Sequence, residues 1–266
     1  MQIDRRANDT VRASRHGSRR HRPRSELGES SGFQACAADD ERVAAAGSQG
    51  ADGEGAGLLS VHDGEGVELW TIVEPSLLRM TDVAVVGLEF AVTGVGLERT
   101  AESDDTKLLR YDENGALRWS RDLPEDGELY QRGFGVIADG GGGTWAFGEA
   151  ASRPYAVHHD RDGHEIEVLD CIGGISGWVL AAAVDPERRL SLGIQLNVQT
   201  PTDESHAWFP TIEDGVVVRA ATFSNDSENS AGPLAVVWRD DGALVLGWGR
   251  YGEEGGGYSE IVALPP

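Results

Sequence analysis

Carboxylates are the side chains of this sequence that could carry out hydrolysis. A glycoside hydrolase needs two of them, roughly 5–10 Å apart, to act as acid and as nucleophile or base. Asp82 alone stands at the start of a strand that the pattern places near the centre of the fold. Four other acids recur at the opposite ends of comparable strands: Asp39, Asp139, Asp185 and Asp240. An acid that recurs in most units is better explained as a turn former than as a catalyst, so the pattern favours a chain without glycosidase activity.

Metal ligation is the second chemistry to consider. Asp160-Arg161-Asp162-Gly163 resembles half of a calcium loop, which needs oxygen ligands at positions 1, 3 and 5 and an acid at position 12. His164 and Cys171 stand at positions 5 and 12, so a hairpin turn explains the run better. His158 and His159 point to opposite faces of a strand, which disfavours a shared zinc ion.

Acids are frequent in the long connections between hairpins, which keeps a weak Ca²⁺ site open although we expect no cofactor and no metal. These acids are Asp52, Glu54, Glu98, Glu102, Asp104, Asp105, Glu125, Asp126, Glu128, Asp203, Glu204, Asp226, Glu228, Glu253 and Glu254. The simplest interpretation is a solvated acidic surface, and the alternative is a site for a cation or a cationic ligand.

Tryptophans offer the clearest signs of ligand binding. Trp178 follows the glycine-rich loop Gly173 to Gly177, where an indole could stack on a sugar or a peptide. The sequence holds no P-loop and no His-Glu-x-x-His motif. We therefore predict two ligand-binding residues, Trp178 and Asp82, and no catalytic residue.

The elements that must position these residues are short strands, and residues 106–148 show the pattern best. Apolar runs alternate there with tight polar turns, and no stretch has helical periodicity. One turn type ends in a glycine at Gly66, Gly115, Gly163 and Gly215, and a second marker closes strands at Gly47, Gly94, Gly148, Gly193 and Gly247. Both markers keep a period of about 50 residues, and four strands per period without a helix predict a β-propeller.

The repeat predicts an all-β fold of about five four-stranded blades. Their expected bounds are Phe33–Val73, Thr81–Leu123, Gly133–Leu169, Trp178–Thr222 and Pro233–Leu264. Small side chains in the first strand of each blade favour a position around the axis. The last blade has only three expected strands, so either it stays incomplete or the chain is part of a larger propeller.

The segment LLRYDENGALRWSRDL resembles the PQQ-like repeat of quinoprotein-type propellers, in which a strand, an Asp-x-x-Gly turn and a Trp recur. The resemblance extends from Phe33 to the C-terminus and is clearest around Trp70 and Trp119. It departs from the pattern where Glu167 and Arg219 replace the Trp. The motif implies the fold and carries no catalytic residue, and the small number of blades disfavours a quinoprotein dehydrogenase.

Charge divides the chain into two parts, residues 1–32 and 33–266. The first is rich in Arg and lacks apolar periodicity, which predicts a disordered tail. The chain as a whole has a net charge of −22, which disfavours nucleic acid as a partner. No apolar run is long enough for a transmembrane helix, and the two cysteines, Cys36 and Cys171, are expected to be free thiols.

The sequence thus favours a non-enzymatic propeller that binds or scaffolds a protein, a peptide or a carbohydrate, and a monomer. A five-bladed glycoside hydrolase or a lectin is the alternative. No signal peptide is visible, and an extracytoplasmic location stays open if the true start codon lies elsewhere.

Overall fold

Short antiparallel strands make up almost all of the described chain. The computed structural model describes residues 32–50, 55–97, 106–123, 131–170, 172–174, 176–197, 205–223, 230–239, 241–251 and 257–264. These residues form nineteen strands and one 3-10 turn, η1 (Ile172–Gly174). The predicted all-β fold is confirmed, whereas the prediction of a disordered tail at residues 1–32 lies, apart from Gly32, outside the described residues.

The strands form five antiparallel sheets, each of consecutive strands. Blade 1 holds β1 (Gly32–Ala38), β2 (Arg42–Gln49), β3 (Ala56–Asp63) and β4 (Glu68–Glu74). Blade 2 holds β5 (Leu77–Val86), β6 (Glu89–Gly96), β7 (Thr106–Tyr111) and β8 (Leu117–Leu123). Blade 3 holds β9 (Gln131–Ala138), β10 (Thr144–Ala150), β11 (Arg153–His159) and β12 (Glu165–Leu169). Blade 4 holds β13 (Gly177–Val184), β14 (Leu190–Asn197), β15 (Ser205–Glu213) and β16 (Val216–Phe223), and blade 5 holds β17 (Ser230–Trp238), β18 (Leu244–Tyr251) and β19 (Gly257–Leu264).

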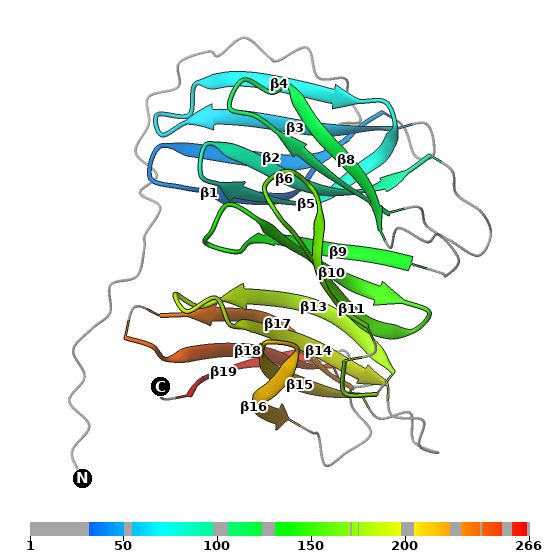
Figure 1. Cartoon of the computed structure of the whole chain (residues 1–266), viewed down its shortest axis with the longest axis vertical. Helices are drawn as coiled ribbons and strands as arrows, with labels where there is room; N and C mark the ends of the chain where they lie inside the picture. Colours follow the sequence, from blue (N-terminus) through cyan, green and yellow to red (C-terminus); the bar gives the residue numbers. More distant parts are fainter. Residues whose placement is uncertain are drawn as a thin grey trace.

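The blades follow one another around an open arc. The first strands β1, β5, β9, β13 and β17 contact each other in that order, which places them on the inside, as their small side chains predicted. Blades 1 and 2 lie in the upper half of Figure 1, blade 3 in the middle, and blades 4 and 5 in the lower half. Within the described residues β1 and β17 make no extensive contact, so the arc is not closed by these two strands. None of the described helical segments has the length and apolarity to cross a membrane.

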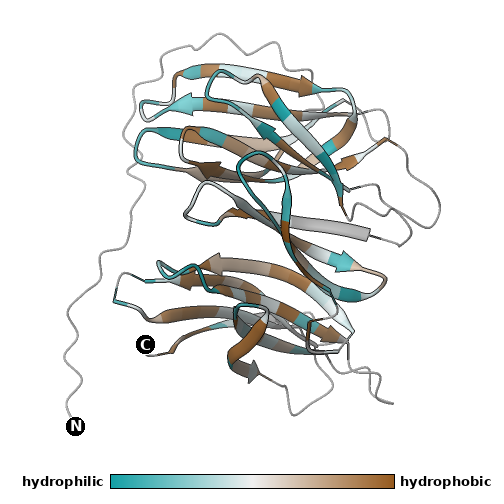
Figure 2. Cartoon of the chain, viewed as in Figure 1, coloured by the Kyte–Doolittle hydropathy of each residue, from teal (hydrophilic) through white to brown (hydrophobic). Residues whose placement is uncertain are grey.

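The hydrophobic core is divided into layers between neighbouring blades. Leu59 and Val61 of blade 1 pack on Phe90 and Val92 of blade 2, and similar clusters fill the spaces between the later blades. Figure 2 shows the hydrophobic residues concentrated in the strands and the hydrophilic ones at many of the turns. Each blade therefore depends on its neighbours for burial of its apolar faces.

Aspartates and glycines build the tight turns, as the sequence predicted. Asp112 Oδ1 accepts hydrogen bonds from the backbone N–H groups of Asn114 and Ala116, both at 2.9 Å. Asp63 and Asp160 make the same two bonds in their own turns. Gly115 has a φ of 83°, a left-handed conformation that strains other residues.

Two tryptophans explain why the turn and the Trp recur together. Trp119 on β8 donates from Nε1 to the carbonyl of Arg161 at 2.9 Å, in the β11–β12 turn of the next blade. A Cβ on Gly163 of that turn would lie 2.7 Å from the indole, so only glycine lets the ring approach. Trp70 makes the equivalent bond, at 2.9 Å, to the carbonyl of Glu113 in blade 2. The repeat therefore encodes an anchor from the fourth strands of blades 1 and 2 to the next blade.

A buried ion pair within blade 2 makes further contacts with blade 3 near the same place. Glu89 accepts a 2.8 Å bond from Arg110 Nε, with side chains only 5% and 1% exposed. Arg161 of blade 3 donates to the same carboxylate at 2.9 Å, and Arg110 Nη2 donates to the carbonyl of Gly142 at 3.1 Å. Burial opposes the ionisation of Glu89, but the bonds from Arg161 and Arg110 outweigh it and lower the pKa of Glu89 overall.

His159 on β11 is a buried titratable group in this interface. It is fully buried and stacks on Trp119, with ring centroids 6.1 Å apart. Neither ring nitrogen has a hydrogen-bond partner within the described residues. Burial, and then the positive charge of Arg121, lowers the pKa of His159 to about 4.

We expect His159 to make the protein less stable as the pH is lowered. Between about pH 6.5, the pKa of His in an unfolded chain, and the folded value of about 4, the unfolded chain takes up a proton that the folded chain refuses. The contribution of neutral His159 to the free energy of unfolding should therefore be complete above pH 6.5. It should fall by up to roughly 3 kcal/mol as the pH is lowered to 4. Urea unfolding across this range measures the slope, and His159→Leu should remove this contribution. Equal slopes in both proteins would contradict the expectation.

Candidate functional site

Asp82, one of the two predicted ligand-binding residues, lies half-buried on the inner strand β5. Its Oδ1 accepts from the backbone N–H of Val83 at 2.9 Å, and its Oδ2 accepts from that of Val136 at 3.0 Å. Val136 is on β9, so Asp82 links the inner strands of blades 2 and 3. Burial raises the pKa of Asp82, and the two backbone bonds oppose that rise. These contacts give Asp82 a structural role whatever else it does.

Trp178, the other predicted residue, lies half-buried on β13 opposite Gln195 of β14. The start of β13 is held by blade 3, because the N–H of Gly177 donates to the carbonyl of Ser152 at 2.9 Å. Trp178 and Asp82 belong to inner strands of blades 4 and 2, with β9 between them. The structure therefore does not bring the two predicted residues into one cluster.

The recurring aspartates form turns, as the sequence analysis proposed. Asp39 accepts from the N–H groups of Glu41 and Arg42, and Asp139 accepts from those of Gly141 and Gly143. Asp185 accepts from the N–H of Arg189 at 2.8 Å. Asp240, the fourth member, lies outside the described residues, as do the acids of the long connections.

Metal binding finds little support in the described part of the chain. Asp160 Oδ1 is occupied by backbone N–H groups, and its Oδ2 lies 3.1 Å from Nδ1 of His164. His158 lies 3.0 Å from Asp139 Oδ2, whereas His159 faces the blade 2 interface. Among the described residues no group of three His, Cys, Asp or Glu side chains could hold a metal ion.

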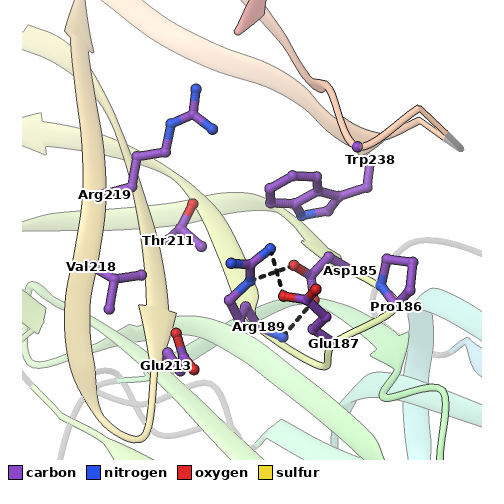
Figure 3. A pocket seen from close by; sticks show the side chains of 10 residues that line it. Asp185, Pro186, Glu187, Arg189, Thr211, Glu213, Val218, Arg219 and Trp238 are labelled. Atoms are coloured by element: carbon purple, nitrogen blue, oxygen red, sulfur yellow. Dashed lines mark hydrogen bonds and ion pairs between the residues drawn. The ribbon is translucent and has the colours of Figure 1, made fainter. Parts of the chain in front are cut away.

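A cleft of about 570 Å³ between blades 4 and 5 is the candidate site (Figure 3). It is formed by the β13–β14 turn, the β15–β16 hairpin and the β17–β18 turn. The lining residues are Asp185, Pro186, Glu187, Arg189, Thr211, Glu213, Val218, Arg219, Trp238 and Gly242. In Figure 3 the ion pairs of Arg189 lie between the β16 residues Val218 and Arg219 on one side and the indole of Trp238 on the other.

Arg189 organises the charges of the cleft. Its Nε donates to Asp185 Oδ2 at 2.6 Å, and its Nη2 lies 3.1 Å from Glu187 Oε2. The guanidinium also lies 5.8 Å from the ring centroid of Trp238, which is a cation–π distance. The hydrogen bond that Arg189 donates to Asp185 raises the pKa of Arg189. Because the Asp185 carboxylate is only 1% exposed, this arrangement fixes the wall of the cleft.

Two cleft features have consequences for binding. Trp238 Nε1 is buried and has no hydrogen-bond partner within the described residues, so a donor is available beside the cleft. The carboxylates of Glu187 and Glu213 belong to exposed residues. The cleft thus combines an aromatic wall, a buried donor and the carboxylates of two exposed residues, of which Glu187 is paired with Arg189.

Sequence reasoning missed this cleft because its residues come from three segments far apart in the chain. One signal was present: Arg219 stands where the repeat places a Trp, four residues after the turn glycine Gly215. A departure from a structural repeat marks a position that is not needed for the blade contact, and here it lines the cleft.

Comparison with known proteins supports the fold and nothing more specific. No family model matches the chain, and no curated protein matches it. The β-propeller domain of the Trilobed protease from Pyrococcus furiosus aligns over 88% of this chain and 68% of its own, with 9% identity and a TM-score of 0.53. This chain is a β-propeller.

Two further solved structures share that fold. A puromycin-hydrolyzing peptidase from Mycobacterium tuberculosis aligns over 89% of this chain and 38% of its own, with 17% identity and a TM-score of 0.53. A subtype N10 neuraminidase-like protein of A/little yellow-shouldered bat/Guatemala aligns over 89% of this chain and 78% of its own, with 12% identity and a TM-score of 0.51. At these identities the propeller is shared and the activities do not transfer.

Proposed function

We propose that this chain is a non-enzymatic β-propeller that acts as a binding module, and that it binds its ligand in the cleft between blades 4 and 5. The observation that carries the proposal is the cleft itself, in which Asp185 and Arg189 hold a fixed wall beside Trp238. Concave sites with an aromatic wall and a few fixed polar groups are typical of ligand binding.

The charge of the cleft favours a cationic ligand group. Its lining holds three carboxylates, Asp185, Glu187 and Glu213, against the guanidinium groups of Arg189 and Arg219. The chain as a whole carries a net charge of −22, which attracts cations over a longer range. A peptide with basic side chains fits this surface better than a neutral sugar does.

Weaker support exists for the other parts of the proposal. The contacts of Trp70 and Trp119 with the following blade favour a PQQ-like repeat over another propeller repeat. We also retain the division into a tail at residues 1–32 and a propeller at 33–266, and a monomeric state. The glycoside hydrolase alternative loses ground because both Asp82 oxygens already accept backbone hydrogen bonds.

The test uses acetyl-arginine amide as a probe of the cleft. We expect binding that weakens with salt, and Glu187→Gln combined with Glu213→Gln should weaken it about 5- to 30-fold, through loss of charge attraction worth ~1–2 kcal/mol. Isothermal titration calorimetry measures both constants. Glu68→Gln, an exposed acid on β4 of blade 1, is the matched control and should bind as the unaltered protein does. If the double variant binds as tightly as the unaltered protein, the proposed site is refuted. If the protein turns over a glycoside and Asp82→Ala abolishes that activity, the glycoside hydrolase alternative replaces the proposed function.

A further inference from the structure

Blade 5 differs from the other four blades in its number of strands. Blades 1 to 4 each contain four described strands, and blade 5 contains three, in the order β17-β18-β19. No described strand pairs with the second edge of β19. About half of the backbone N–H and C=O groups of such an edge point away from the sheet and can pair with another strand.

The repeat shows what occupies the corresponding place in the other blades. In blades 2 and 3 the turn between the third and fourth strands packs its glycine, Gly115 or Gly163, against a Trp of the preceding blade. In blade 4 the turn glycine Gly215 lies opposite Glu167, with Oε1 3.6 Å from a Cβ built there. The fourth strand of each of blades 1 to 3 thus contacts the turn at which the fourth strand of the next blade begins.

Arg219 of blade 4 occupies the equivalent position toward blade 5. Arg219 lies opposite Thr211 of β15, as Trp119 lies opposite Arg110 of β7. The last residue of β19, Leu264, pairs with Leu244, which follows Gly242 at the rim of the cleft. The cleft therefore lies where the first residues of a fourth strand of blade 5 would pack.

Side chains on β19 are exposed, and a further strand beside β19 would cover part of their surface. Ile261 is 79% exposed, the largest value among the described large hydrophobic side chains. Its neighbour Glu260 is exposed as well, and Glu213 and Asp214 are exposed at the β15–β16 turn. A strand that lies along β19 would meet apolar side chains in its middle and carboxylates near the cleft.

We propose that an extended, basic peptide segment of a partner protein adds to β19 as the fourth strand of blade 5, antiparallel to it, with its first residues in the cleft. This inference rests on the proposed function and names the partner class for that site. Backbone hydrogen bonds to β19 supply affinity that is independent of sequence, and alternate side chains supply specificity. The acidic surroundings favour arginine or lysine at alternate positions.

The experiment uses a capped octapeptide of alternating valine and arginine, matched to the eight residues of β19. We expect it to bind the full chain, as measured by fluorescence anisotropy, and to slow amide hydrogen exchange within Gly257–Leu264. The same peptide with N-methyl groups at alternate backbone nitrogens keeps its charge and should bind about 30-fold or more weakly, because several backbone hydrogen bonds are lost. Ile261→Arg should weaken binding about two- to fivefold through like charge, and Ile261→Val should not.

The outcomes separate this inference from the proposed function. If the N-methylated peptide binds equally well, or if β19 gains no protection, strand addition is refuted. If the octapeptide fails while acetyl-arginine amide still binds, strand addition is refuted and the cleft proposal stands. If the octapeptide binds only after residues 1–31 are deleted, the proposal of a partner peptide is refuted, and the chain's own N-terminal segment is the fourth strand instead.

Discussion

Replacing Glu89 by Gln is expected to lower the free energy of unfolding by about 3–5 kcal/mol, because it leaves the buried charge of Arg110 without its partner. The Arg110 side chain is 1% exposed and cannot turn toward solvent without opening the contact between blades 2 and 3. Its Nη1 already lacks a hydrogen-bond partner within the described residues, so the loss of Glu89 is not compensated locally. Urea unfolding at pH 7 measures the change.

Controls separate the buried pair from the exposed charges around it. Arg118 and Arg161 also contact Glu89, but their side chains are 44% and 66% exposed. Arg118→Gln should therefore cost less than about 1 kcal/mol. Glu89→Leu combined with Arg110→Leu removes both buried charges and should recover much of the loss of Glu89→Gln. A double variant as unstable as Glu89→Gln would contradict this account.

The contribution of Glu89 to stability depends on pH over a range of its own. Since the pKa of Glu89 is lowered in the folded chain, its contribution is complete above the unfolded value of 4.5 and is lost as the pH falls further. The contribution of His159 changes at higher pH, between about 6.5 and 4. The two groups therefore lower the free energy of unfolding over different parts of the acidic pH range.

Local signals made most of the fold predictable from the sequence. The expected second blade, Thr81–Leu123, lies within the observed β5–β8, and the three-stranded last blade was expected too. Turns fix hairpin register locally, through an Asp that accepts backbone N–H groups and a Gly with positive φ. A repeat near 50 residues then shows each of these signals several times.

The charged contacts between blades were not predictable in the same way. Glu89 and Arg110 are 21 positions apart in the chain, and Arg161 is 72 positions from Glu89. No repeat marks them, because such a network occurs at one interface and follows from the register of three separate hairpins. The cleft has the same origin, since Asp185, Arg219 and Trp238 meet only once blades 4 and 5 pack.

Trp119→Ala is expected to be the second strongly destabilising change, with a loss of about 3–5 kcal/mol. The indole is 9% exposed, stacks on His159 and packs against Gly163 of the next blade. Trp119→Phe keeps a ring but loses the hydrogen bond to the carbonyl of Arg161, and should cost about 1–2 kcal/mol. Leu117→Ala, on the same strand and 50% exposed, is the matched control and should change stability by less than about 0.5 kcal/mol.

The same anchor can be tested by adding it where it is missing. Glu167 occupies the Trp position of blade 3 and lies opposite Gly215 of blade 4. Because Gly215 has a φ of 72° and no Cβ, its turn presents the same surface that Trp70 and Trp119 contact in the earlier blades. Glu167→Trp should therefore raise the free energy of unfolding by about 1 kcal/mol, from the apolar area it buries. Thermal unfolding measures the gain, and Glu167→Gln controls for the loss of charge alone. A destabilised Glu167→Trp variant would show that the Trp anchor needs more than the turn glycine that faces it.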